Sequence, residues 1–205
     1  HDRGIPIIAD DTIGSPVNID PLPFADLVFG SLTKSFAGRG DILAGSLVIS
    51  PQSHWKELFK ELVPQLILAS LSDADAIALE SASKDVHLRV NQLNTSCLTL
   101  KQHLESHPDI KKVLHPADCA NFQSLMRPNG GFGCLLSFEL TGELSRTQKF
   151  YDSLEVCKGP SLGTNFTLVC PYVLLAHYQE LEWAEQCGVP KKLLRVSVGL
   201  ENPEE

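Results

Sequence analysis

Three short apolar runs, each closed by glycine or polar residues, constrain the fold of this chain more than any other feature. They cover residues 5–9, 25–30 and 45–50. Runs of this length are too short for stable helices, and continuous apolar runs are typical of strands that are buried on both faces of a parallel sheet. We therefore expect three fully buried, parallel strands at one edge of an α/β sheet.

Polar side chains follow the first two runs. Asp10 and Asp11 come after the first run, and residues 31–34 come after the second. Ligands of α/β sheets bind beyond the carboxyl ends of the strands, so these residues are candidates for one site. A lysine after a strand is most often a solvated surface residue. The pairing of Lys34 with Asp10 at two strand ends favours the functional interpretation instead.

The middle of the chain is predicted to be helical. Residues 54–63 have mixed helical character and meet a breaker at Pro64, and residues 83–106 are followed by Pro108. The second segment carries an apolar stripe with alternating spacings of four and three residues, which is typical of one helix face. We expect this helix to link two domains while packing on both. The stripe consists of Val86, Val90, Leu93, Cys97, Leu100 and Leu104.

A second α/β pattern begins after Pro108. We place the domain boundary near residue 107, which gives a first domain of residues 1–107 and a second of residues 108–205. In the second domain we expect strands at 110–114, 131–140 and 193–198, helices at 143–154 and 173–186, and a loop at 159–164.

Composition excludes several classes of protein. The net charge is −8 and no Lys/Arg cluster is dense enough for a nucleic-acid surface. The longest apolar stretches fall far short of a membrane span. None of the six cysteines lies in a CxxC pair, so we expect buried free thiols, no metal site and a reducing, cytoplasmic location.

The Lys34–Asp10 pair suits the chemistry of pyridoxal 5'-phosphate (PLP). A lysine amine attacks an aldehyde once it has lost its proton, which burial and neighbouring charge promote. A carboxylate beside the pyridine nitrogen keeps that nitrogen protonated, so the ring can take up electrons from a substrate. The hydroxyls of Ser31 and Thr33 can donate hydrogen bonds to a phosphate.

Several motifs, in order along the chain, resemble those of the Cys/Met-metabolism PLP enzymes. The sequence A-D-D-T at 9–12, followed by S-L-T-K at 31–34, is similar to the family pattern V-D-N-T … S-x-T-K. The S-L-G loop at 161–163 and the closing L-R-V-S-V-G-L-E at 194–201 also match. The departures around residues 35–40 and 164–172 resemble the fungal cystathionine γ-synthase branch. The resemblance implies a fold-type I PLP-dependent transferase: a remnant of the large parallel-sheet domain followed by a C-terminal α/β domain.

The resemblance also implies roles for individual residues at the cofactor. Lys34 would form the internal aldimine and act as acid and base once released. Asp10 would pair with the pyridinium nitrogen, on the opposite strand face from Asp11. Thr12 would lie near the ring, and the remaining cofactor contacts would come from Ser31 and Thr33 at the phosphate.

Two further residues are expected at the substrate. Arg195 would bind the α-carboxylate, a task suited to a bidentate guanidinium, and Ser161 would lie beside Lys34 and the substrate. Taken without the resemblance, Arg195 is more often an ordinary ion-pair residue, and Thr12 and Ser161 are more often turn or cap residues.

The implied activity is γ-replacement on an activated homoserine ester by cysteine, which yields cystathionine in methionine biosynthesis. A cystathionine γ-lyase or an O-acetylhomoserine sulfhydrylase would share nearly every motif. A catalytically inactive fragment or interaction module is the alternative from another class. The opening H-D-R-G resembles the end of a helix, so we expect the carboxyl-terminal part of a longer enzyme. We expect small amino-acid substrates and a homo-oligomer, a dimer or tetramer, for the full-length protein.

Overall fold

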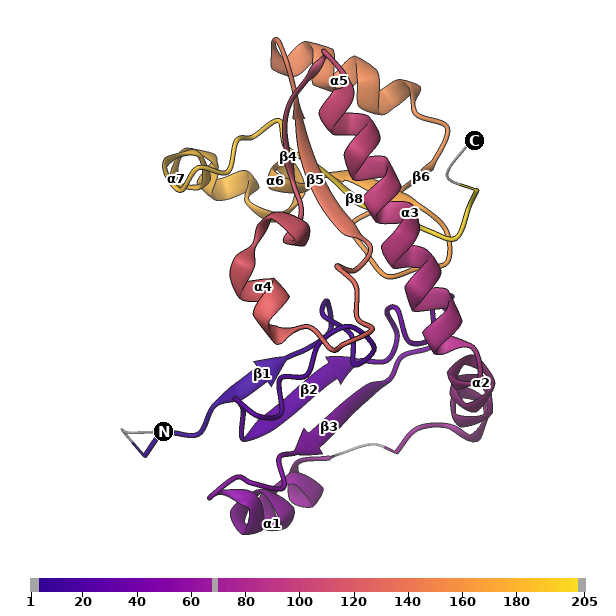
Figure 1. Cartoon of the computed structure of the whole chain (residues 1–205), viewed down its shortest axis with the longest axis vertical. Coiled ribbons are helices and arrows are strands. Elements are labelled where there is room, and N and C mark those ends of the chain that lie inside the picture. Colours follow the sequence, from indigo (N-terminus) through magenta and orange to yellow (C-terminus); the bar gives the residue numbers. More distant parts are fainter. Residues whose placement is uncertain (1–3, 68–69, 203–205) are drawn as a thin grey trace.

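The computed structural model describes residues 4–67 and 70–202, and it contains two sheets beside one long helix (Figure 1). The first sheet has the order β1-β2-β3, and the second has the order β4-β5-β8-β7-β6. The strands of the first sheet are β1 (Ile8–Asp10), β2 (Leu27–Ser31) and β3 (Gly45–Ile49). Those of the second are β4 (Ile110–Leu114), β5 (Leu135–Leu140), β6 (Cys157–Lys158), β7 (Leu168–Pro171) and β8 (Leu194–Ser197).

The direction of the first three strands differs in part from the prediction. Strands β1 and β2 are parallel, with Asp10 opposite Phe29, but β2 and β3 are antiparallel. Parallel neighbours need a long crossover, usually a helix. Residues 32–44 between β2 and β3 form turns and irregular structure instead, so the chain returns antiparallel.

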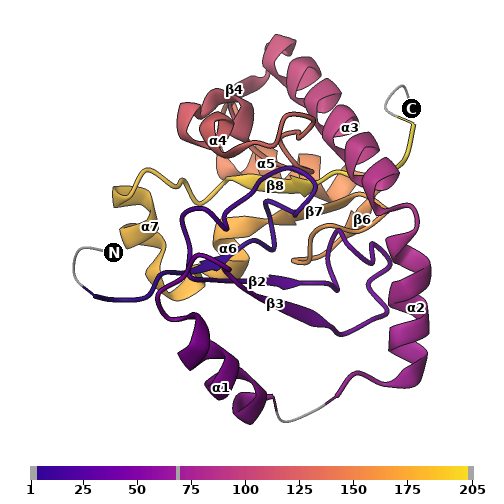
Figure 2. The same cartoon turned by 60° about the horizontal axis from the view of Figure 1, so that its bottom comes forward.

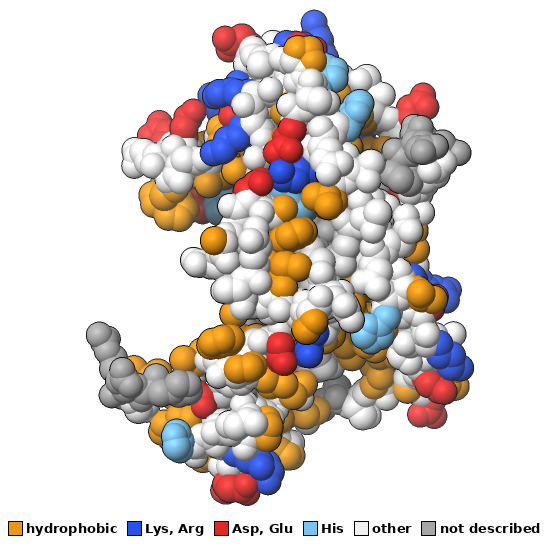
Figure 3. Space-filling view, viewed as in Figure 1, with side chains coloured by type: hydrophobic (Ala, Val, Ile, Leu, Met, Phe, Trp, Pro, Cys, Tyr) orange, Lys and Arg blue, Asp and Glu red, His pale blue; other side chains and the backbone are white. Residues whose placement is uncertain are grey.

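The prediction that these strands are fully buried is also wrong. Leu27 and Val28 of β2 are buried, whereas Ile8 of β1 is 55% exposed and Leu47 of β3 is 48% exposed. Both exposed strands are edges of the described sheet, where fewer neighbours cover the side chains. Apolar side chains accordingly gather on the lower part of the surface, around the first sheet (Figure 3).

Helix α3 (Val86–Ser106) confirms the predicted apolar stripe. Its first turns pack beside the first sheet, where Val86 and Val90 form a buried cluster with Val17, a residue between β1 and β2. Its later turns pack on the second sheet, where Cys97 and Leu104 belong to the main core. The helix therefore packs on the second sheet and on the loops beside the first, and Figure 2 shows it from a second direction.

The two helices before α3 depart from the prediction. Helix α1 (Lys56–Leu66) continues through Pro64, which lies in its last turn, where a missing N–H and a clash with the preceding turn affect few hydrogen bonds. Helix α2 (Asp73–Ser83) was not predicted. It begins at a Ser72 cap, whose hydroxyl accepts a hydrogen bond from Asp75 N.

The described residues after α3 contain four short or medium helices. They are α4 (Ala120–Leu125), α5 (Leu144–Ser153), α6 (Tyr172–Ala176) and α7 (Leu181–Gln186), with 3₁₀ turns at Pro116–Asp118 and Tyr178–Glu180. The predicted helix over residues 173–186 is interrupted at His177, whose φ of −128° and ψ of 27° are not helical. His177 Nδ1 lies 2.7 Å from Glu180 Oε1, a local contact that stabilises the bend.

The buried core lies mainly in the second sheet. It is formed by Leu136, Phe138 and Leu140 of β5, with Val169, Leu194, Val196 and Val198. All six cysteines are free thiols, but only Cys97, Cys134 and Cys170 are buried, so the expectation of buried thiols holds for half of them. Among the helices of the described residues, none has the length and apolarity needed to cross a membrane.

Candidate active site

The carboxyl ends of β1 and β2 lie at the same edge of the first sheet because the two strands are parallel. Asp10 is the last residue of β1, and Ser31 is the last residue of β2. Asp10 Oδ1 accepts a hydrogen bond from Thr12 N at 2.9 Å. Thr12 Oγ1 in turn accepts one from Ser31 N at 2.9 Å. Three of the predicted site residues are therefore joined at this edge.

Asp10 and the neighbouring Asp11 have different environments, as the alternation of a strand requires. Asp10 is exposed, whereas Asp11 is 8% exposed and its Oδ1 has no hydrogen-bond partner among the described residues. Burial raises the pKa of Asp11 to about 6, although the positive charge of Arg127 opposes the shift. Asp10 is thus the more accessible of the two carboxylates at this strand end.

Lys34 lies in the turn that follows β2. Its N–H donates to Ser31 O at 3.4 Å, and its own carbonyl accepts from Gly38 N at 2.7 Å. Its Nζ donates to Ser161 Oγ at 2.9 Å, across a separation of 127 residues. This bond connects the first sheet to the loop between β6 and β7 of the second.

Arg195 lies in β8 and contacts the same loop from the other side. Its Nη2 donates to Ser161 O at 3.1 Å and also to Pro160 O. Its guanidinium lies 5.2 Å from the centre of the Tyr172 ring, within cation–π range. Its Nε is buried without a hydrogen-bond partner in the described part of the chain. Arg195 is therefore held beside Ser161 with donor capacity left over.

The hydroxyl of Thr33 is engaged by the backbone. It accepts from Ala44 N at 3.1 Å and donates to Ala44 O at 3.4 Å, which fixes the turn after β2 to the segment before β3. To donate to a phosphate, Thr33 would have to give up the longer of these two bonds.

The predicted site residues thus form two groups. Asp10, Thr12 and Ser31 make one group, and Lys34, Ser161 and Arg195 make the other. The turn from Ser31 to Lys34 joins them. Among the described contacts, none joins the Asp10 carboxylate to the Lys34 amine directly.

Two residues near Lys34 were not predicted from the sequence. Arg89 of α3 bonds to the backbone just after Lys34, and Ser197 Oγ of β8 accepts a hydrogen bond from Gly163 N at 2.8 Å. The position of Arg89, one residue before the buried Val90, was a usable signal, since an arginine beside an apolar stripe must find partners as it is buried. The last strand's alternation gives no comparable indication for Ser197.

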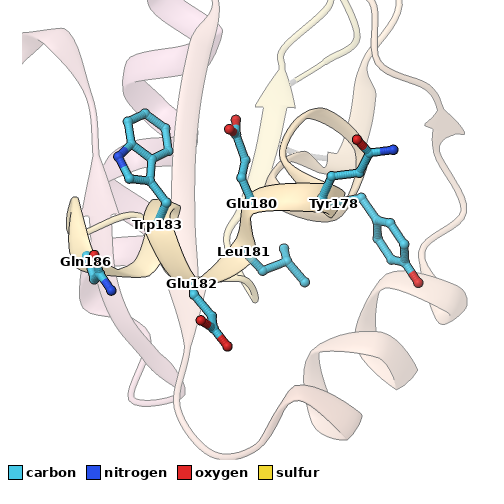
Figure 4. A pocket seen from close by; sticks show the side chains of 7 residues that line it. Tyr178, Glu180, Leu181, Glu182, Trp183 and Gln186 are labelled. Atoms are coloured by element: carbon cyan, nitrogen blue, oxygen red, sulfur yellow. The ribbon is translucent and has the colours of Figure 1, made fainter.

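A separate surface hollow of about 540 Å³ lies along the 3₁₀ turn and α7 (Figure 4). Its lining includes Tyr178, Glu180 and Trp183. All of its lining residues come from one continuous segment, 178–186, and none of them is a predicted site residue. The hollow is therefore distinct from the group of residues around Lys34.

Comparison with known proteins gives matches along the whole chain. Residues 1–205 match the family described as "Cys/Met metabolism PLP-dependent enzyme". A cystathionine γ-synthase of Neurospora crassa is 42% identical over 202 residues, covering 97% of this chain and 32% of the relative. One from Saccharomyces cerevisiae is 42% identical over 207 residues, covering 96% and 32%. The chain thus spans about a third of the length of these curated relatives.

A solved structure agrees with the sequence comparison. The cystathionine γ-synthase of Xanthomonas oryzae pv. oryzae, in complex with aminoacrylate and cysteine, superposes with a TM-score of 0.86 at 26% identity. The match covers 99% of this chain and 53% of that one. The mixed α/β fold therefore agrees with the fold-type I class expected from the motifs.

Proposed function

The chain belongs to the Cys/Met metabolism PLP-dependent enzyme family, and we propose that the full-length protein is a cystathionine γ-synthase. The proposed reaction breaks the Cγ–O bond of an activated homoserine ester and forms a Cγ–S bond to cysteine. The cysteine thiol loses its proton, and the ester group leaves as a carboxylate. The 42% identity to two fungal cystathionine γ-synthases supports this assignment over other activities in the family.

The side chains around Lys34 fit PLP. They include an amine on a flexible stem, which can bind an aldehyde, and an exposed carboxylate at the neighbouring strand end. The hydroxyls of Ser31 and Thr33 lie between them and can donate to a phosphate, Thr33 by giving up its 3.4 Å bond to Ala44 O. We propose that Lys34 carries the cofactor, that Asp10 pairs with its pyridine nitrogen, and that Thr12 lies beside the ring. When bound, PLP supplies an electron sink for charge that develops on the substrate.

Three residues would act on the substrate in this proposal. Lys34 Nζ would move protons at Cα and Cβ of the substrate, one after the other. Ser161 Oγ, which accepts the 2.9 Å hydrogen bond from Nζ, would hold the amine in position between these transfers. Arg195 would bind the α-carboxylate with the guanidinium N–H groups that the 160–161 carbonyls do not use. The Lys34–Ser161 contact is the observation that carries the proposal.

The proposal extends to organisation and location. We propose a boundary near residue 107, between a first domain with the Lys34 turn and a second with Arg195. We also propose a homo-oligomer, a dimer or tetramer, in the cytoplasm. Six free thiols in the described residues are compatible with a reducing compartment.

Product analysis of the full-length protein tests the proposed reaction. The protein would be incubated with an O-acyl-homoserine alone, with an O-acyl-homoserine and cysteine, and with an O-acyl-homoserine and inorganic sulfide. Cystathionine that forms only when both are present is the expected result. A keto acid and ammonia as the main products with or without cysteine would favour a lyase. Consumption of inorganic sulfide rather than cysteine would favour a sulfhydrylase, and no turnover of any pair would favour the inactive module.

A further inference from the structure

Arg89 of α3 is a buried arginine with all five of its N–H groups in use. Its side chain is 10% exposed. Nε donates to Asp85 Oδ1 at 2.8 Å on the same helix. One Nη2 bond goes to Ala82 O at 3.0 Å, at the end of α2. These two contacts join the guanidinium to its own helix and to the end of α2.

Two of the other three donors of Arg89 reach the Lys34 turn, and the third reaches the loop that contains Ser161. Nη1 donates to Ser35 O at 3.1 Å, and Nη2 donates to Phe36 O at 2.6 Å. These carbonyls belong to the two residues directly after Lys34. Nη1 also donates to Asn165 Oδ1 at 3.4 Å, in the loop that begins with Ser161. One guanidinium therefore holds the Lys34 turn and the Ser161 loop together.

The backbones of the turn and the loop are in close contact at the same place. Asn165 N donates to Gly38 O at 2.6 Å. A Cβ on Gly163 would lie 2.6 Å from Ser35 N and 3.1 Å from Lys34 Cβ, and a Cβ on Gly38 would collide with Asn165 Oδ1. The distance between Lys34 and Ser161 thus depends on this interface rather than on the two side chains alone.

We propose that Arg89 is a positioning residue that sets the geometry between Lys34 Nζ and Ser161 Oγ. The inference rests on the proposed function, because it assumes that Lys34 captures the cofactor aldehyde. Arg89 itself contacts neither the amine nor any predicted cofactor-binding side chain among the contacts described. Its effect is exerted through the carbonyls of residues 35 and 36. A lysine at position 89 keeps the charge but cannot reproduce five donors in a planar fork.

The rate of covalent cofactor capture separates positioning from plain stabilisation. Full-length protein freed of cofactor would be mixed with pyridoxal 5'-phosphate and quenched with borohydride at successive times. Peptide mapping would then quantify the pyridoxyl group on Lys34. Arg89→Lys is expected to slow capture about tenfold or more, since small misplacements of reacting groups cost large factors in rate.

Asp85→Ala is the matched control. It removes the ion pair on the exposed side of Arg89 but leaves the bonds to Ser35 O and Phe36 O. Its capture rate is expected to stay within about twofold of the wild type, even where unfolding shows it to be less stable. If both variants slow capture in proportion to their loss of stability, Arg89 is only a structural residue.

Asn165→Ala provides a second variant should Arg89→Lys fail to fold. It removes the 3.4 Å side-chain contact and keeps the Asn165 N bond to Gly38 O. We expect capture to slow severalfold, and an unchanged rate would overturn the positioning role. If Arg89→Lys and Asn165→Ala are both labelled on Lys34 at the wild-type rate, the positioning role is wrong but the proposed function stands. Absence of label on Lys34 in the wild type contradicts the proposed function and the role with it.

Discussion

The two sheets of this chain differ in how their apolar residues are covered. In the second sheet, β5 and β8 place Leu136, Phe138 and Leu194 in a core where each is at most 3% exposed. In the first sheet, Ile8 and Leu47 are about half exposed although their strands are equally apolar in sequence. The region that provides Lys34 is therefore the less covered one.

This difference separates the residues that determine global stability from those that determine the geometry around Lys34. The second sheet has a core of its own, formed with α3 and α5. The Lys34 turn is held by a small apolar cluster, which includes Phe36, Ala37 and Leu79, and by polar contacts to Ser161 and Arg89. We infer that substitutions in the second core change global stability most, whereas substitutions around the turn change the site most.

A matched pair of leucines tests this contrast with the largest expected effect. Leu136→Ala should destabilise the full-length protein by about 3 kcal/mol, because it leaves a cavity in a packed core. Leu47→Ala should cost about 1 kcal/mol or less, because its side chain is half exposed. Denaturant unfolding of both variants is the measurement. Equal losses would mean that the two sheets are equally covered in the full-length protein.

A pair of glycines sharpens the comparison at the turn. Gly163 and Gly188 both have positive φ, at 71° and 79°, but only a Cβ on Gly163 would meet other atoms. Gly188→Ala should cost about 1 kcal/mol from backbone strain alone. Gly163→Ala should cost roughly 2 kcal/mol more and should reduce cofactor capture, because the turn must move. Thermal unfolding and cofactor content would be measured together, and equal effects would argue against close packing at Lys34.

The second sheet contains a paired buried carboxylate, Glu139. Burial pushes its pKa up, but hydrogen bonds from Lys111 at 3.0 Å and an ion pair with Lys192 at 3.2 Å outweigh this and lower it. A lowered pKa in the folded state stabilises the fold above the ordinary value of 4.5, and this contribution is lost as the pH falls below it. Glu139→Gln should therefore cost about 2 kcal/mol at neutral pH. The loss should vanish in acid, which unfolding at a series of pH values would check.

The first 107 residues contain another buried carboxylate, Asp11, whose Oδ1 has no hydrogen-bond partner among the described residues. Burial raises its pKa to about 6 from an ordinary 3.8. Asp10 and Asp20 also raise it, while Arg127 lowers it. The folded state then holds a proton that the unfolded state has lost, so the stability contributed by this group falls as the pH rises from about 4 to 6. Asp11→Asn should remove that slope and raise stability slightly at neutral pH. A variant with the wild-type pH profile would contradict the shift.

The sequence predicted the helical pattern of α3 better than it predicted the burial of strand side chains or the direction of the strands. The apolar stripe from Val86 to Leu104 predicted α3 and its packing on both parts of the chain, because a helical period depends on the residues themselves. The antiparallel β3 was missed, since an apolar run is the same in either direction. The exposed Ile8 was missed for a related reason: an apolar run does not say which of its faces has a neighbour.

The site shows the same limits. The strand-end rule located Asp10 and Ser31 correctly at one edge, because it follows from parallel pairing. The link from Lys34 to Ser161 came only through a family resemblance, since 127 residues separate them. Its place beside the apolar stripe marked Arg89 as an arginine that needs partners, but not which ones, because those at the Lys34 turn are main-chain carbonyls, which every residue has.

Borohydride reduction of the cofactor-loaded full-length protein, followed by peptide mapping, tests the central claim most directly. We expect one pyridoxyl group per chain, on Lys34, and no pyridoxyl group in a Lys34→Ala variant that still folds. Lys60 and Lys84 serve as internal controls, since both are exposed and paired with nearby glutamates. A pyridoxyl group on either of these lysines, with Lys34 unmodified, would contradict the assignment of the site.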